Sequence, residues 1–279
     1  MWWKKVDDLL LSYLEEDVGW GDVTTQSIFG GEKVRAVMLA KEGGVVAGIP
    51  FAIRVFQLLG EVRVLRKMEE GTEIKKGDVL LEIEGEADTI LTGERVALNI
   101  LQRLSGVATL TREMAKRLEK KGIRLLDTRK TTPGMRYLEK YAVRVGGGVN
   151  HRMDLQHMVL IKDNHKLLAG GVKEAVRRVR EKIGPTYVVE VEVENLEELR
   201  EVLECDGVNM VLLDNFSPED VKEAVKILKG RLTVEVSGNI TPQNIDLYAI
   251  EGIHYISSGY ITHSARWLDI SMRVLEVVR

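Results

Sequence analysis

Basic side chains are concentrated between Leu125 and His165, in a stretch that contains two turns rich in glycine and proline. The chain has 279 residues and a formal net charge of -3, so it lacks the global basic surface that attracts nucleic acid. A dense local cluster in an acidic chain indicates instead a small and strongly negative ligand. The basic side chains of this stretch include Arg129, Lys130, Arg136, His151, Arg152, Lys162 and His165.

The arginines of this set suit a planar acid. A guanidinium is a planar fork of donors that pairs with carboxylate or phosphate through two parallel hydrogen bonds. Arg129, Arg152 and Arg95 have this capacity, whereas Lys130 and Lys162 supply point charges. Because Lys162 directly follows an apolar run, we expect it to be buried, with its ammonium group turned toward the ligand.

The histidines and the cysteine exclude other chemistry. His151 can donate a hydrogen bond to a carboxylate or titrate near neutral pH. The spacing of His151, His157 and His165 fits neither a metalloprotease nor a zinc finger, so we predict no zinc site. Cys205 is the only cysteine, which excludes an internal disulfide.

Carboxylates occupy two other apolar runs. Glu190, Glu192 and Glu194 alternate with valine, and Asp214 ends the run V-L-L-D. Alternation places the three glutamates on one side of a strand, which is either a solvated edge or the mouth of a barrel. Together Glu192 and Asp214 could hold Mg²⁺, directly or through water, or bind sugar hydroxyls.

Two Ser-Gly turns point to a phosphate. They lie in V-E-V-S-G-N-I-T, residues 234–241, and in I-S-S-G-Y, residues 256–260. Backbone N–H groups in such turns form the phosphate site that follows the late strands of many barrels. One Ser-Gly turn is weak evidence, whereas two in succession favour a phosphate group at this end of the ligand.

The elements that position these residues alternate between strands and helices, which predicts a parallel sheet with right-handed crossovers. A (β/α) barrel gathers polar residues from the carboxyl ends of its strands around one mouth, whereas an open doubly wound sheet gathers them at one switch point. We favour the barrel and keep the open sheet as the alternative. The strand-end residues are Asp127, Lys162, Glu192, Asp214, Ser237 and Ser257. The expected strands are 124–126, 158–161, 187–193, 210–213, 232–236 and 254–257, and the expected helices are 173–182, 196–204 and 218–228.

The first hundred residues predict a separate α+β domain. The segment 67–85 resembles the hairpins that carry biotin or lipoate, but no lysine stands at its tip, so we interpret it as a structural hairpin. We expect domain 1 to span residues 1–104 and the barrel to span 105–269, with the segment 270–279 returning to domain 1. Within domain 1 the expected strands are 34–41, 44–47, 62–65 and 79–83, and the expected helices are 51–59 and 94–104.

Composition sets the remaining bounds. With 44% apolar residues the chain can bury a full core. No apolar run reaches the roughly 18 residues of a membrane span, and the amino terminus lacks a signal-peptide pattern. We therefore expect a cytoplasmic enzyme that binds neither membranes nor nucleic acid.

The motifs together resemble a known family. They are D-T-R-K-T-T-P-G-M-R, G-G-G-V-N-H-R-M-D-L, I-K-D-N-H, V-E-V-E-V, L-L-D-N-F and V-S-G-N-I, in this order. The amino-terminal E-D-V-G-W-G-D-V-T and E-R-V-A-L-N-I-L-Q-R-L-S-G-V-A-T belong to the same pattern. This series is similar to that of the quinolinate phosphoribosyltransferases, the decarboxylating enzymes of NAD biosynthesis.

The resemblance implies an amino-terminal α+β domain and an incomplete barrel of about seven strands. It also implies a homodimer in which the first domain of one subunit covers the barrel mouth of the other, while assembly into hexamers stays open. The implied quinolinate site is Arg95, Arg129, His151, Arg152 and Lys162, with Arg95 crossing the interface. Lys130, Glu192 and Asp214 would contact phosphoribosyl pyrophosphate and Mg²⁺ and are the implied catalytic residues. Ser237, Gly238 and Gly259 would hold the 5-phosphate, with Asn239 and Ser258 as departures from the usual pattern beside them.

The implied reaction transfers phosphoribosyl to quinolinate and releases pyrophosphate, CO₂ and nicotinate mononucleotide. The transfer makes the pyridine nitrogen cationic, which stabilises the carbanion left by decarboxylation. Three alternatives remain at this point. A related enzyme that uses nicotinate without decarboxylation would bind one carboxylate, and the full set of cations argues against it. The other two are the related protein encoded with molybdate transporters and a non-catalytic phosphate-binding barrel.

Overall fold

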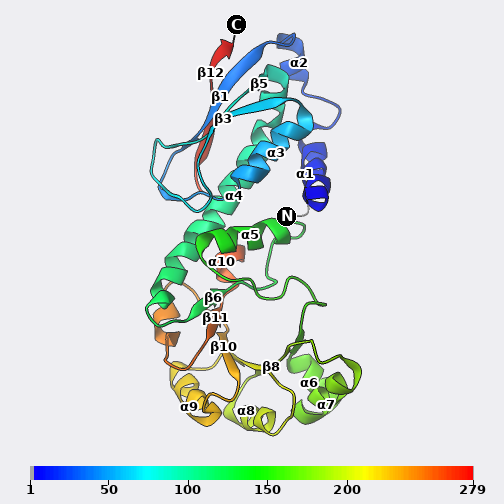
Figure 1. The fold of residues 1–279 in the computed structure, drawn as a ribbon, viewed down its shortest axis with the longest axis vertical. Coiled ribbons are helices and arrows are strands. Elements are labelled where there is room, and N and C mark those ends of the chain that lie inside the picture. The colour runs from blue at the N-terminus through cyan, green and yellow to red at the C-terminus, as the bar shows by residue number, and fades with distance from the viewer. Residues whose placement is uncertain (1–2, 279) are drawn as a thin grey trace. The chain divides into compact units, whose positions relative to one another are not determined.

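The computed structural model describes residues 3–278, which form two compact units (Figure 1). The first unit contains the chain up to Leu110, the short piece Arg144–Gly146 and the chain from Ala265 onward. The second contains Thr111–Val143 and Gly147–Ser264. Among the described residues, no helix combines the length and the apolar character that a membrane span requires.

The first unit is built on a four-stranded antiparallel sheet in the order β12-β1-β5-β3. The last strand runs along β1, so the end of the chain completes this sheet. The segment 67–85 lies in a structural hairpin, because β3 and β5 pair antiparallel across a long connection. The short strand β4 (Glu73–Ile74) in this connection pairs with β2 (Gly44–Val45). The sheet consists of β1 (Lys33–Ala40), β3 (Val62–Lys67), β5 (Val79–Glu86) and β12 (Ile270–Val278).

Helix α4 (Ala87–Glu119) is far longer than the helix expected over 94–104. Glycines interrupt its sequence pattern, but in the structure they permit close packing. A Cβ atom on Gly106 would lie 1.9 Å from the backbone oxygen of Arg266. Ser105 Oγ, on the same helix, accepts a hydrogen bond from the N–H of Ala47 at 3.0 Å. The other helices of this unit are α1 (Trp3–Val18), α2 (Val23–Ile28) and α3 (Ile49–Leu59).

The second unit contains a six-stranded parallel sheet in the order β6-β11-β10-β9-β8-β7. A parallel bridge between Leu126 and Val149 extends this sheet beyond β6. The predicted mixed α/β fold with a parallel sheet is confirmed. The strands are β6 (Arg124–Leu126), β7 (Val159–Ile161), β8 (Val189–Val193), β9 (Met210–Asp214), β10 (Thr233–Ser237) and β11 (Tyr255–Ser257).

Helices α7 (Val172–Lys182), α8 (Leu196–Leu203) and α9 (Pro218–Leu228) lie outside the strands of this unit (Figure 1). Two of these helices, α8 and α9, begin at the expected positions because a side chain caps the first turn. Asn195 accepts the N–H of Glu198 at 2.9 Å, and Ser217 accepts that of Asp220 at 3.1 Å. The further helical segments are α5 (Arg136–Gly146), α6 (Asp163–Ala169), α10 (Tyr260–His263) and the 3₁₀ helix η1 (Ile245–Tyr248).

Strand register decides which side chains share the inner face of this sheet. Glu192 and Glu235 are both in register with Leu212, and Asp214 is in register with Ser237. Since successive residues of a strand face opposite sides, these side chains point to one face, and so does Glu190. The valines between them pack on the helical side, which explains why all of β8 is buried.

Candidate active site

A cavity of about 540 Å³ opens at the carboxyl ends of the parallel strands. It carries cations from the loop after β6 and from the segment before β7, and acids from β8, β9 and β10. A cavity of this size accommodates a small ligand. Its lining residues are Thr128, Arg129, Lys130, His151, Arg152, Leu155, Leu160, Lys162, His165, Glu192, Leu212, Asp214, Glu235, Ser237 and Ser257.

The two arginines of this cavity are prepared for an anion. Arg129 Nη1 is buried and has no hydrogen-bond partner among residues 3–278. Arg152 Nη1 donates a long bond, 3.4 Å, to the backbone oxygen of Met158. Burial and then the charge of Arg129 lower the pKa of the Arg152 guanidinium. An anion bound here would satisfy the buried donor and relieve the repulsion between the two cations.

The acidic side of the cavity carries Glu192 and Asp214. Burial, followed by the charge of Glu192, raises the pKa of Asp214, while Lys162 and Lys130 oppose this shift. Lys162 Nζ forms an ion pair with Glu192 Oε2. The Lys162 side chain is 42% exposed, so the expectation that it is buried is wrong. Its strand ends at the open mouth of the cavity, where solvent and a carboxylate both reach the ammonium group.

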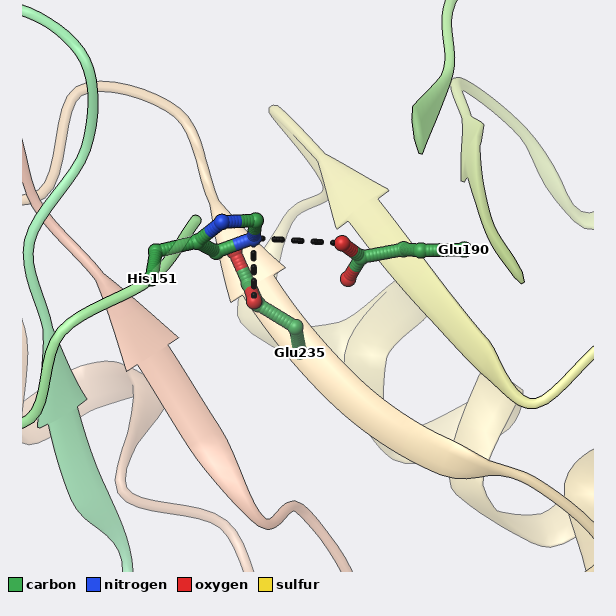
Figure 2. A group of neighbouring side chains, drawn as sticks. All are labelled: His151, Glu190 and Glu235. Atoms are coloured by element: carbon green, nitrogen blue, oxygen red, sulfur yellow. Dashed lines mark hydrogen bonds and ion pairs between the residues drawn. The ribbon is translucent and has the colours of Figure 1, made fainter. Parts of the chain in front are cut away.

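His151 lies between two buried glutamates (Figure 2). Its Nε2 is 3.1 Å from Glu190 Oε2 and 3.4 Å from Glu235 Oε2. Burial opposes the charged ring, but hydrogen bonds to both carboxylates raise the pKa of His151 to about 10. Burial and then the charge of Glu235 raise the pKa of Glu190 to about 7. The carboxylates therefore favour the charged form of the His151 ring, and the negative charge of Glu235 disfavours a second negative charge on Glu190.

Behind the cavity, Asp127 and Lys140 form a fully buried ion pair. Burial raises the pKa of Asp127 and lowers that of Lys140. Asp127 also accepts the N–H of His151 at 2.8 Å and Nδ2 of Asn150 at 2.6 Å, and Lys140 Nζ donates to the His151 oxygen at 3.0 Å. The pair thus holds the backbone that carries His151 and Arg152. Asp127 was expected at the mouth, but it is not part of the cavity lining.

The first Ser-Gly turn adopts left-handed backbone angles, with φ of 100° at Gly238 and 51° at Asn239. A Cβ on Gly238 would come within 2.4 Å of Asn215 Oδ1, so glycine is required there. In the second turn, Ser258 is buried and its Oγ donates to the oxygen of Ile240 at 2.6 Å. Ser258 therefore contributes to the core through its side chain.

Comparison with known proteins matches this arrangement. Residues 22–105 match the model of the quinolinate phosphoribosyl transferase N-terminal domain, and residues 107–273 match that of the C-terminal domain. The chain belongs to the quinolinate phosphoribosyltransferase family.

Several members of this family are close in sequence and structure. The chain is 43% identical over 267 residues to the probable nicotinate-nucleotide pyrophosphorylase (carboxylating) of Bacillus subtilis, covering 95% of this chain and 92% of the relative. The crystal structure of NadC from Streptococcus pyogenes aligns with a TM-score of 0.94 at 41% identity, covering 99% of each chain. The nicotinate-nucleotide pyrophosphorylase from Francisella tularensis aligns with a TM-score of 0.92 at 38% identity, covering 98% of this chain and 96% of that one.

The structure brings most of the predicted site residues together and leaves some apart. Gly238, Asn239, Ser258 and Gly259 are not among the lining residues of the cavity. Arg95 is exposed on α4 in the first unit. The cavity is lined by Arg129, Lys130, His151, Arg152, Lys162, Glu192, Asp214 and Ser237.

Sequence reasoning missed Glu235. It is 1% exposed and lines the cavity beside His151. The available signal was the alternation V-E-V-S, which repeats the pattern V-E-V of β8. A glutamate between two buried valines on a barrel strand must point to the interior.

Proposed function

We propose that this chain transfers phosphoribosyl from phosphoribosyl pyrophosphate to quinolinate, with loss of CO₂, and so supplies nicotinate mononucleotide for NAD biosynthesis. The observation that carries the proposal is the buried Nη1 of Arg129, which has no hydrogen-bond partner within residues 3–278 and lies beside Arg152 in a cavity that also holds Glu192 and Asp214. The basic side chains that could bind a planar diacid and the acidic side chains that could bind a sugar or a metal ion line the same cavity. Such an enzyme acts on soluble substrates and fits a cytoplasmic location.

In this proposal Arg129 and Arg152 bind the carboxylates of quinolinate. Lys162 and His165 stand on the same wall. Lys162 is paired with Glu192 in the free cavity, so binding of quinolinate offers its ammonium a second anion. The cations also screen the repulsion between two negatively charged substrates in a partly dry site.

Glu192 and Asp214 fit a magnesium ion. Both offer carboxylate oxygens, the hard ligands that Mg²⁺ takes directly or through water. Burial, followed by the charge of Glu192, raises the pKa of Asp214. A bound Mg²⁺ would supply charge neutralisation for the pyrophosphate leaving group. Lys130 stands at the same mouth and stabilises charge on that group, while Ser237, Gly238, Asn239, Ser258 and Gly259 form the two turns assigned to the 5-phosphate.

The order of steps follows from charge. Attack of the pyridine nitrogen on the anomeric carbon breaks the bond to pyrophosphate and leaves the ring nitrogen cationic. The adjacent carboxylate then leaves as CO₂, because the cationic ring stabilises the electron pair that remains on the ring carbon, and this carbon takes up a proton from solvent to give nicotinate mononucleotide. Transfer therefore precedes decarboxylation, and the arginines must release one carboxylate while retaining the other.

A direct assay tests the proposal. The protein is incubated with quinolinate, Mg²⁺ and phosphoribosyl pyrophosphate, and both CO₂ and nicotinate mononucleotide are measured. We expect equal amounts of the two products, no reaction after chelation of Mg²⁺, and essentially no turnover of nicotinate, because the missing carboxylate leaves a buried cation unpaired. Comparable turnover of nicotinate would contradict the assignment of Arg129 and Arg152.

We further propose a homodimer in which Arg95 completes the site of the partner subunit; hexamers would repeat the same contact. Arg95 is exposed in the single chain. When inactive Arg95→Ala and Arg129→Ala proteins exchange subunits, each mixed dimer has one intact site, so activity should recover to roughly a quarter of the wild-type value. No recovery after demonstrated exchange would exclude the shared site.

A further inference from the structure

Hydrogen bonds join the loop after β6 to the turn after β11 at two points. The N–H of Ser258 donates to the oxygen of Leu126 at 3.0 Å, where the loop begins. Thr262 Oγ1, on α10, lies 2.8 Å from the backbone oxygen of Lys130, further along the loop. In the proposed function the loop provides Lys130 for the pyrophosphate group, and the turn provides Gly259 for the 5-phosphate.

The hydroxyl group of Thr262 has one hydrogen to donate and two carbonyl groups within reach. The carbonyl of Lys130 is at 2.8 Å and that of Gly259 is at 3.0 Å. A threonine in a helix often donates to the residue three positions before it. Here, however, the two lone pairs of the Gly259 oxygen already accept the N–H groups of Thr262 at 3.1 Å and His263 at 2.9 Å. Since Thr262 is 0% exposed, solvent does not compete for the hydroxyl hydrogen, which is therefore directed to the Lys130 oxygen.

The main chain of Lys130 is thus held at both of its polar atoms. Its N–H donates to Thr128 Oγ1 at 3.0 Å, and its oxygen accepts from Thr262. Lys130 is exposed, and a lysine has a flexible four-carbon stem. Holding the backbone that carries this stem lowers the conformational entropy that is lost when the ammonium group binds an anion.

Gly259 determines where the stem of Lys130 packs. Its backbone angles, φ of −72° and ψ of −19°, are open to any residue, so conformation does not require a glycine there. Contact requires it, because a Cβ atom on Gly259 would lie 2.8 Å from Cδ and 3.2 Å from Cβ of Lys130. The lysine stem therefore packs directly against the backbone of the turn.

We propose that Thr262 is a positioning residue that holds Lys130 against the turn at Gly259, so that the groups binding the pyrophosphate and the 5-phosphate keep a fixed separation. The two ends of phosphoribosyl pyrophosphate are then bound by one connected piece of structure. Such preorganisation favours a sugar phosphate whose anionic groups match that separation. The identity of the anionic groups rests on the proposed function, whereas the contacts among Thr262, Lys130 and Gly259 do not.

Calorimetric titration with magnesium pyrophosphate tests this role without turnover. Thr262→Val keeps the size of the side chain and removes the hydroxyl group. We expect the Kd for magnesium pyrophosphate to rise about fivefold, the effect of one lost hydrogen bond, while the Kd for quinolinate stays unchanged. Thr262→Ser keeps the hydroxyl group and should restore the wild-type affinity.

Two further variants separate positioning from stability. In a Lys130→Met background, Thr262→Val should weaken pyrophosphate binding no further, because it acts through the lysine. Thr109→Val is the matched control: its hydroxyl group donates to the oxygen of Ser105 at 2.7 Å and accepts the N–H of Val45 at 2.8 Å, within the first unit. This control should lower the melting temperature and leave the pyrophosphate Kd unchanged.

Three results with variants would overturn the positioning role. They are an unchanged pyrophosphate Kd in folded Thr262→Val, an equal loss of quinolinate affinity, and a full additional loss in the Lys130→Met background. A wild-type protein that does not bind magnesium pyrophosphate would overturn it as well. If Thr262→Val does not fold, the smaller Thr262→Ala provides the same comparison. A wild-type protein that binds pyrophosphate as expected but does not convert quinolinate would refute the proposed function and leave the link between Thr262 and Lys130 standing.

Discussion

Breaking the buried pair of Asp127 and Lys140 should destabilise the second unit strongly, and by different amounts from the two sides. Both side chains are 0% exposed. Removing one partner of such a pair costs about 3–5 kcal/mol, because the other charge stays buried without compensation. In Lys140→Met the carboxylate keeps two donors, the N–H of His151 and the amide of Asn150, so the loss should fall at the lower end.

Asp127→Asn should cost more. Its amide group would turn a donor toward Asn150 or His151, and Lys140 would keep only the His151 oxygen as a partner. At the upper end of that range, the melting temperature should fall by something on the order of 10 °C. The double variant should lose less than the sum of the two single losses, because neither charge remains unpaired.

The pH dependence provides a check of sign. The charge of Asp127 opposes the effect of burial on Lys140, so its removal lowers the pKa of the folded lysine further, while the unfolded value stays near 10.5. Between these two values the unfolded state binds more protons, and the stability of Asp127→Asn should rise with pH relative to wild type. Urea and thermal melts followed by circular dichroism measure all of these differences. Additive single losses, or a defect of Asp127→Asn that deepens at alkaline pH, would refute the reasoning.

Three further changes test separate features. Gly106→Ala places a Cβ 1.9 Å from the backbone oxygen of Arg266, so we expect a loss of about 1–3 kcal/mol in melts, and an unchanged melting temperature would mean that the contact is looser. Asp7 pairs with Arg54 at 2.8 Å, and this bond lowers the pKa of Asp7 below 3.8. The ion pair should stabilise the fold fully above pH 3.8 and lose this effect as the pH falls through the lowered pKa of the folded state, so Asp7→Asn and wild type should differ in melting temperature at neutral pH and converge in strong acid. A difference that stays constant with pH would contradict this linkage. Lys162→Met should keep its melting temperature, because a pair with a side chain 42% exposed is worth about 1 kcal/mol or less, but should bind quinolinate weakly in calorimetric titration; unchanged affinity would remove Lys162 from the site.

The amino-acid sequence determined the order of the elements and where their polar ends lie. The apolar run before Asp214 and the alternation through Glu192 are local patterns, and both become strands at the expected places. Helix starts at Asn195 and Ser217 depend on one side chain reaching a nearby N–H, which is also local. The mixed α/β fold and the basic side chains that line the cavity could be predicted from the sequence, because both depend on residues that lie close together in the chain.

Only the tertiary structure decided which side chains from different strands come together in the site. Glu190 reaches His151 across 39 positions of the chain, and Glu235 joins them only because β8 and β10 both align with β9 at Leu212. Sequence spacing carries no information about such a register. Lys162 was expected to be buried because of the strand before it, yet the open mouth leaves its side chain 42% exposed. Lys140, in contrast, is fully buried on a helix that the sequence did not reveal. Burial of a charge depends on which elements pack over it, and this is settled only when the whole sheet and its helices assemble.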